Sequence, residues 1–266
     1  MTDLFSIRGK KAVVTGGSRV IGYMIAGEFL KAGAARVYIC ARRAEACDAA
    51  AAELGRLGEG ECVSVPCDVG DVEGVETLAR AVEEREERLE ILVNNAGIAW
   101  GAPVESHPIE QLDRVLRVNV RAVFHLTQRL LPLLRAAASA EDPARVINIG
   151  SVDGLAIPLT ENYGYSASKA AVHMLTRHLA HALVRDHVNV NAIAPGLFPS
   201  RMTRWFFDGP AIEGTLETIP MRRAGTAEDV GGTAIYLASR AGAYLTGVVI
   251  PVSGGVATID SPVPAR

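Results

Sequence analysis

The feature of the sequence that most constrains its fold is a regular alternation of short apolar runs with longer segments of helical composition. Strands that are apolar on both faces and are joined through helices form a parallel sheet covered on both sides. We therefore predict one doubly wound α/β domain over residues 1–266. Its strands are predicted at 11–15, 36–40, 62–65, 89–94, 145–149, 188–193 and 248–251.

The segments between these runs predict helices at 21–30, 44–57, 72–88, 166–185 and 227–238. Residues 109–137 predict two more helical stretches, interrupted near Pro132 because proline lacks the backbone donor that a helix interior needs. The charged run at 83–88 is typical of a solvated helix face.

Two segments depart from this alternation. Residues 197–220 form a long insertion after a predicted strand and carry three consecutive aromatic residues, Trp205, Phe206 and Phe207. Because ligands of open α/β sheets bind beyond the carboxyl ends of the strands, we predict that this insertion is a lid over a ligand. Residues 258–266 are predicted to form a loose tail.

Composition disfavours several classes of protein. The formal net charge is −3, from 27 basic and 30 acidic residues, whereas nucleic-acid binders usually carry a basic excess. The sequence has no apolar run of about 18 residues that would predict a membrane span. Its start does not resemble a signal peptide, so we expect a cytoplasmic protein. The four cysteines fit neither a disulfide framework nor a zinc site, so we expect reduced thiols and no metal.

The turn after the first predicted strand is rich in glycine and indicates a dinucleotide site. It reads Thr-Gly-Gly-Ser-Arg-Val-Ile-Gly over residues 15–22. A strand that leads through glycines into a helix points backbone N–H groups and the helix dipole at a pyrophosphate. Val20 stands where a small residue would suit the dinucleotide fingerprint better, so a tight turn without a ligand stays open as the alternative.

The end of the second predicted strand indicates which dinucleotide would bind. NAD sites usually place an acid there, on the ribose 2′-hydroxyl, whereas this chain has Arg42 and Arg43 and no acid before Glu45. Arg42, together with Arg19 from the turn, could pair with a 2′-phosphate. This favours NADPH over NADH, with two solvated surface arginines as the alternative.

A tyrosine and a lysine four residues apart, Tyr165 and Lys169, lie on one face of a predicted helix. An ammonium ~4 Å from a phenol, at an effective dielectric near 20, favours the phenolate by roughly 4 kcal/mol. The pKa of Tyr165 is therefore expected to fall by about three units before desolvation takes some back. Tyr165 would exchange a proton with a carbonyl or alcohol oxygen, and Ser151, just past the strand at 145–149, would hold that oxygen.

These motifs, in this order and spacing, resemble the short-chain dehydrogenase/reductase family over essentially the whole chain. The matching segments are 15–22, 67–69, 94–97, Asn119, Ser151, Tyr165, Lys169 and 195–196. The resemblance implies a Rossmann-type domain and a homotetramer through the helices around 109–137 and 165–185. Within the family, the chain is most similar to bacterial ketoreductases of the 3-oxoacyl-reductase type.

The resemblance also implies roles for single residues. Tyr165 is implied as the catalytic acid and base, Ser151 as the holder of the substrate oxygen, and Asn119 as the holder of a proton-relay water. Lys169 would also bind the nicotinamide ribose. The residues implied or predicted to bind the cofactor are Gly16, Ser18, Arg19, Ile21, Gly22, Arg42, Asp68, Val69, Asn95, Ala96, Gly97, Tyr165, Lys169, Pro195, Gly196, Phe198 and Ser200.

Three departures from the family pattern stand out. Val20 replaces a glycine and would crowd the cofactor, and Ser200 replaces a common threonine. Tyr165 follows Ser151 by fourteen residues, one more than usual, with Tyr163 as a second tyrosine nearby. Only Tyr165 has a lysine four residues further on, so the catalytic role is assigned to it.

The implied activity is NADPH-dependent reduction of a ketone, possibly of the 3-oxoacyl type, with Tyr165 as proton donor. An apolar substrate pocket is predicted from Trp100, Leu155, Ile157, Leu159, Tyr163, Trp205 and Phe206. The aromatic cluster at 205–207 could instead pack the lid onto the body or a neighbouring subunit. Two other functions stay open: an NAD-linked alcohol, polyol or steroid dehydrogenase, and a dinucleotide sensor without catalysis.

Overall fold

A parallel sheet forms the centre of the molecule. The computed structural model describes residues 4–158, 160–199, 214 and 216–259. Within them, seven parallel strands pair in the order β3-β2-β1-β4-β5-β6-β7. The strands are β1 Lys11–Thr15, β2 Arg36–Ala41, β3 Glu61–Pro66, β4 Ile91–Asn94, β5 Ala144–Ile149, β6 Val188–Pro195 and β7 Val249–Val252. The strand order reverses between β1 and β4, which is where doubly wound sheets bind ligands.

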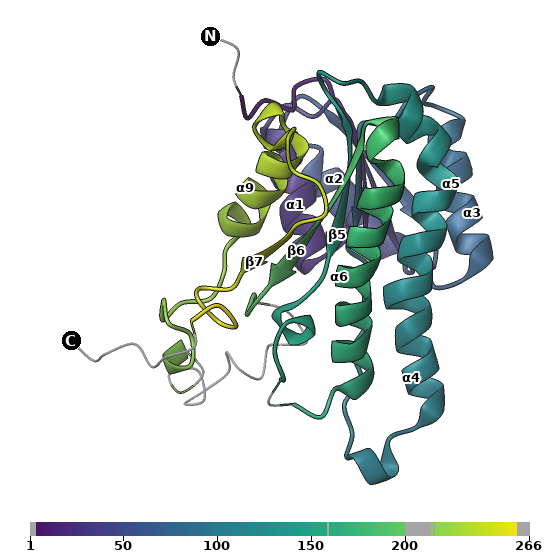
Figure 1. The fold of residues 1–266 in the computed structure, drawn as a ribbon. Coiled ribbons are helices and arrows are strands. Elements are labelled where there is room, and N and C mark those ends of the chain that lie inside the picture. Colours follow the sequence, from purple (N-terminus) through teal and green to yellow (C-terminus); the bar gives the residue numbers. More distant parts are fainter. Residues whose placement is uncertain (1–3, 159, 200–213, 215, 260–266) are drawn as a thin grey trace.

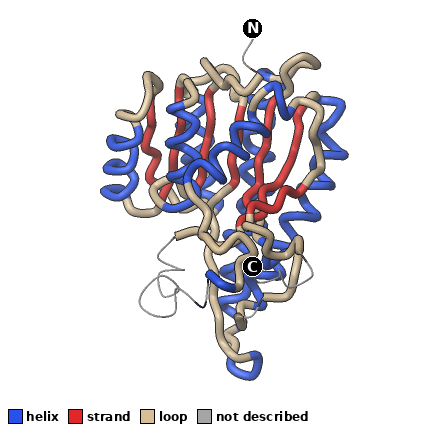
Figure 2. The backbone as a smooth tube through the Cα atoms, turned by 90° about the vertical axis from the view of Figure 1, so that its left-hand side faces the viewer, coloured by secondary structure: helices blue, strands red, loops and turns tan. Residues whose placement is uncertain are grey.

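Helices cover both faces of this sheet (Figures 1 and 2). They are α1 Val20–Lys31, α2 Ala44–Leu54, α3 Val72–Glu83, α4 Ile109–Leu116, α5 Ala122–Ala137, α6 Tyr163–Leu183 and α9 Ala227–Ala238. The contacts place α1, α2 and α9 on one face and α3, α5 and α6 on the other. The predicted fold class is therefore confirmed. Within the described part of the chain, no helix combines the length and apolar character needed to cross a membrane.

Alternation along the strands divides the core into two layers. Ala12 and Val14 of β1 point into the layer that contains Phe29 of α1, whereas Val13, between them, points into the layer that contains Leu130 of α5. All five of these side chains are fully buried. Burial on both faces explains why the strands read as continuous apolar runs rather than as alternating ones.

The predicted break at Pro132 is wrong. Pro132 lies inside α5 on the exposed surface, and the irregular segment is a π-helical turn, Arg117–Arg121, between α4 and α5. A proline inside a helix leaves the carbonyl oxygen four residues earlier without its helical donor. On the solvent side of the helix that oxygen can bond to water, so the helix tolerates the proline. The π turn contains Asn119 and so belongs to the functional site, as single π turns often do.

The charged run at 83–88 is exposed as predicted except at Glu86, but it does not continue the helix. The helix ends at Glu83, and the carboxylate of Glu86 is buried against β1 and β2. It accepts a hydrogen bond of 2.7 Å from the Tyr38 hydroxyl and lies 2.6 Å from Lys11 Nζ. Arg36 contacts it as well, so the buried charge is paired and hydrogen-bonded.

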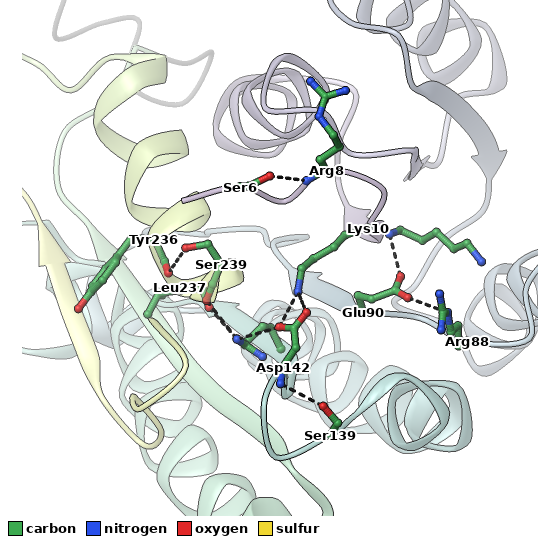
Figure 3. A network of polar contacts seen from close by, with 12 residues as sticks. Ser6, Arg8, Lys10, Arg88, Glu90, Ser139, Asp142, Tyr236, Leu237 and Ser239 are labelled. Atoms are coloured by element: carbon green, nitrogen blue, oxygen red, sulfur yellow. Dashed lines mark hydrogen bonds and ion pairs between the residues drawn. The ribbon is translucent and has the colours of Figure 1, made fainter. Parts of the chain in front are cut away.

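A second, partly buried network ties together the amino-terminal edge of the sheet (Figure 3). Lys10 Nζ, just before β1, donates to both oxygens of Asp142 at 2.7 and 2.6 Å. Arg145, fully buried in β5, donates to the carbonyl oxygens of Leu237 and Ser239 at 3.1 Å each. These carbonyls end α9, so the guanidinium caps a helix C-terminus and joins three elements.

Candidate active site

A cavity of about 440 Å³ opens at the carboxyl ends of the strands, at the point where the strand order reverses. Fifteen of the residues predicted to bind the cofactor line it, together with Ser151. They are Gly16, Ser18, Arg19, Ile21, Arg42, Asp68, Val69, Asn95, Ala96, Gly97, Tyr165, Lys169, Pro195, Gly196 and Phe198. Gly22 and Asn119 do not line the cavity, and Ser200 is outside the described residues.

The glycine-rich turn is fixed by hydrogen bonds to the segment after β4. Thr15 Oγ1 accepts from the backbone N–H groups of Asn95 and Ala96, both at 2.9 Å. The Asn95 side chain donates to Thr15 O at 2.8 Å. A Cβ at Gly22 would lie 2.4 Å from Asn95 Nδ2, so only glycine allows the first turn of α1 to approach this closely.

Val20 adopts a left-handed backbone conformation with φ of +52°. A β-branched residue is rarely found in this region, and a non-glycine residue held there costs on the order of 1–3 kcal/mol. Its side chain also lines the cavity. The crowding predicted from the sequence is thus accompanied by backbone strain at the same residue.

We expect Val20→Gly to stabilise the protein and to tighten NADPH binding. Relief of the strain, less the 0.5–1 kcal/mol entropic cost of a glycine, should leave a gain of about 1 kcal/mol in the free energy of unfolding. Denaturant unfolding and a cofactor titration would measure both effects. His187→Gly is a control, because His187 has a similar φ of +56° outside the cavity and should leave cofactor affinity unchanged. A Val20→Gly protein that is less stable than the wild type would contradict the inference that the backbone is strained at Val20.

Two unpaired arginines lie at the predicted adenosine end of the cavity. Arg19 and Arg42 both line it and are exposed. No carboxylate among the described residues forms an ion pair with either guanidinium. They are therefore available to an anionic ligand, as a 2′-phosphate requires.

The catalytic candidates Ser151, Tyr165 and Lys169 meet in the same cavity. Ser151 follows β5, and the other two lie in the first turns of α6. Lys169 Nζ lies 5.5 Å from the centroid of the Tyr165 ring and donates to the carbonyl oxygen of Ile149 at 2.8 Å. The lysine is thus held between the tyrosine and the end of β5.

The predicted fall in the pKa of Tyr165 is not found in the structure. Burial raises the pKa of Tyr165 to about 12, opposed by a hydrogen bond with Ser151. Burial likewise lowers the pKa of Lys169 to about 8. Desolvation outweighs the attraction predicted between the two groups, because both are buried and the ammonium faces the ring and a carbonyl oxygen.

Asn119 is buried in the π turn and joins three segments. Its Nδ2 donates to Ile98 O and to Ser168 Oγ, and its Oδ1 accepts from Ile98 N, all at 2.9 Å. The side chain therefore fixes the segment after β4 against α6. Its implied role in holding a relay water stays a prediction.

Sequence reasoning missed two groups of residues. Arg114 and Arg117 line the cavity from α4 and the π turn, five and two residues before Asn119 respectively. Asn148, fully buried in β5, accepts from Asn94 Nδ2 and donates to Thr176 Oγ1, both at 2.9 Å. A polar residue within an apolar strand was the available signal for Asn148.

The four predicted substrate residues that the structure describes lie outside the cavity lining. Trp100, Leu155, Ile157 and Tyr163 are exposed, at 42%, 41%, 96% and 45% respectively. The segment after Trp100 approaches the start of α6, since Ala102 N donates to Glu161 O at 3.1 Å. Leu159, Trp205 and Phe206 lie outside the described residues, as does most of the predicted lid.

Comparisons with known proteins agree with this geometry. The model of the short chain dehydrogenase family matches residues 10–210. The chain is 53% identical to a rhamnolipids biosynthesis 3-oxoacyl-[acyl-carrier-protein] reductase of Pseudomonas aeruginosa, covering 96% of this chain and 99% of that protein. The chain belongs to the short-chain dehydrogenase family and is an oxidoreductase.

Two solved structures show the same fold. The complex of Pseudomonas aeruginosa RhlG with NADP superposes with a TM-score of 0.93, at 52% identity, covering 97% of this chain and 100% of that one. A gluconate 5-dehydrogenase from Burkholderia cenocepacia, in complex with NADP and tartrate, has a TM-score of 0.87 at 30% identity, covering 97% and 98%.

Proposed function

We propose that the protein is an NADPH-dependent reductase of a ketone, of the 3-oxoacyl type, with Tyr165 as proton donor. The observation that carries this proposal is one cavity that holds Ser151, Tyr165 and Lys169 together with the unpaired guanidinium groups of Arg19 and Arg42. The likeness to a reductase of 3-oxoacyl substrates and to an NADP complex supports the choice of substrate class and cofactor.

The residues that line the cavity fit this cofactor. The turn at 16–22 presents the N-terminus of α1 to the pyrophosphate, and Arg19 and Arg42 would hold the 2′-phosphate. Asp68 and Val69 would contact the adenine, and the residues at 195–198 would contact the nicotinamide. NADPH, when bound, supplies the hydride that reduces the carbonyl carbon.

The protein's own residues would orient the substrate oxygen and supply the proton. The Ser151 hydroxyl would donate a hydrogen bond to the substrate carbonyl oxygen and so keep it beside the phenol. Tyr165, protonated at neutral pH because burial raises its pKa, would give its proton to that oxygen as negative charge develops there. The ammonium of Lys169 would then stabilise the phenolate that remains.

Turnover with purified protein tests this function. We expect NADPH to be consumed with 3-oxoacyl thioesters and more slowly, or not at all, when NADH replaces it. The panel should also contain gluconate, other polyols and steroid alcohols with NAD or NADP. Exclusive activity on the alcohols with NAD would overturn the proposal in favour of a dehydrogenase, and NADPH binding without turnover on any carbonyl would favour a sensor.

We also propose a cytoplasmic homotetramer. Helices α4, α5 and α6 carry large exposed apolar side chains: Ile109, Phe124 and Met174 are 64%, 46% and 61% exposed. Where such side chains form a contiguous patch, they mark a subunit interface. Sedimentation of the purified protein measures the mass directly, and a monomer at micromolar concentration would refute the tetramer.

A further inference from the structure

A buried histidine of α6, His173, packs directly against the segment that carries Ser151. We call this segment, residues 150–154, the serine turn. It begins at Gly150 after β5 and continues through the short 3₁₀ turn Val152–Gly154. His173 is 3% exposed and does not line the cavity, so it cannot touch a ligand held there. Any effect of this residue on the reaction must pass through the groups that it packs against.

Both ends of the serine turn are glycines, and both contact the His173 ring. A Cβ at Gly150 would lie 2.1 Å from Nε2 and 2.7 Å from Cδ2 of the imidazole, and its third neighbour is also an atom of this ring. A Cβ at Gly154 would lie 2.9 Å from Cε1. Neither glycine has a positive φ. At Gly150 it is therefore the ring, and not the backbone conformation, that leaves no room for a side chain.

Hydrogen bonds make the serine turn a single unit. The N–H of Asp153 donates to Ser151 Oγ and that of Gly154 to Ser151 O, both at 3.1 Å. On the other side, Gly150 N donates to the carbonyl oxygen of Ile193 in β6 at 2.7 Å. A shift of either glycine is therefore passed on to the serine between them.

The helix that carries the reacting tyrosine also supports this turn. Tyr165, Lys169 and His173 follow one another at intervals of four residues, so they lie along one face of α6. A Cβ at Gly154 would lie 2.7 Å from Ala170 N, so the end of the serine turn lies directly on the helix backbone. The His173 ring fills the space between this face of α6 and Gly150.

The contact depends on shape rather than on hydrogen bonding. Neither nitrogen of the His173 ring forms a hydrogen bond of normal geometry within the described part of the chain. Burying a polar ring without such partners costs free energy, which an apolar side chain would avoid. What the ring provides is a flat group that fits between two glycine backbones.

We propose that His173 is a positioning residue: its ring, packed against Gly150 and Gly154, sets the distance of the serine turn from α6 and so keeps Ser151 beside Tyr165. The consequence for the reaction rests on the proposed function, whereas the support of the turn does not. A misplacement of about 1 Å can lower a rate about 100-fold. Loss of the ring should therefore lower kcat and leave the KM for NADPH nearly unchanged, because His173 does not line the cavity.

An exchange of volume between Gly150 and His173 tests the contact. Gly150→Ala directs a methyl group into the ring, and His173→Ala removes the support of the turn. We expect each to lower kcat for ketone reduction by about 10–100-fold. In the double variant the methyl group enters the space that the ring has left, so kcat should exceed that of Gly150→Ala. His173→Gln, whose planar amide reaches about as far as Nε2, should retain more activity than His173→Ala.

Backbone hydrogen exchange provides a readout that needs no turnover. We expect peptides that cover the serine turn to exchange faster in His173→Ala than in the wild type. Leu183→Ala is the matched control, because Leu183 is buried in the last turn of the same helix, ten residues further on. It loses core packing and stability, but it should leave both the exchange of the serine turn and kcat unchanged.

Folded His173→Ala with wild-type kcat, or with unchanged exchange of the serine turn, would overturn the proposal. A double variant no more active than Gly150→Ala, or an equal loss of kcat in Leu183→Ala, would do the same. If Gly150→Ala does not fold, His173→Ala and His173→Gln still decide. If the wild type reduces no carbonyl, the proposed function fails, and the exchange measurement still decides whether His173 supports the turn.

Discussion

Replacement of Tyr165 by phenylalanine is expected to lower kcat for ketone reduction by about 10²–10⁴-fold, the contribution typical of a positioned general acid. The ring remains, so its contact with Lys169 Nζ, 5.5 Å from the centroid, should persist. NADPH affinity and the unfolding transition should therefore change little. Steady-state kinetics, a cofactor titration and thermal unfolding together measure the three effects.

Tyr163→Phe is the matched control for this experiment. Tyr163 lies two residues earlier on α6, is 45% exposed, and makes an edge contact with His107 at 6.1 Å between ring centroids. It does not line the cavity. We expect it to retain kcat within a few-fold. Comparable losses in both variants would mean that the proton comes from elsewhere.

The second large effect is expected for cofactor choice in Arg42→Asp. The substitution removes a guanidinium that could form a charge-assisted pair with the 2′-phosphate, and it adds a carboxylate that repels the phosphate and can accept from ribose hydroxyls. We expect the ratio of kcat/KM for NADPH to that for NADH to fall by about 100-fold. Kinetics with both cofactors at fixed substrate concentration measure the ratio.

Arg43→Asp separates this effect from a general change in surface charge. Arg43 is the exposed N-cap residue of α2, adjacent to Arg42, and it does not line the cavity. The same change in net charge at this position should leave the cofactor ratio close to that of the wild type. A ratio unaffected by Arg42→Asp would show that Arg42 is only a solvated surface residue.

Much of the fold could be predicted because the strands are buried on both faces. The alternation of Ala12, Val13 and Val14 between two layers produces the continuous apolar run that marks β1 in the sequence. The Tyr165–Lys169 pair could also be predicted, since the two residues are four apart in the sequence and lie on one helix face.

The remainder depends on tertiary contacts that local sequence does not encode. Glu86 belongs to a run with the composition of a solvated helix, but Lys11, Arg36 and Tyr38 come from distant strands to bury and pair it. The π turn around Asn119 is set by its bonds to Ile98 and Ser168, whereas Pro132 only resembles a break. Likewise, the pKa of Tyr165 depends on its burial, which spacing alone does not specify.

The two ends of strand β5 lie in parts of the molecule that tolerate substitution to different degrees. At its start, Arg145 is locked to the end of α9 and, through Asp142, to Lys10, so a substitution there disturbs several elements at once. At its end, the chain passes Ser151 into loops whose large side chains face solvent. Substitutions in those loops could therefore change the substrate preference without altering the sheet and the helices packed on it. A gluconate 5-dehydrogenase shares this fold at 30% identity, as expected where one scaffold serves different substrates.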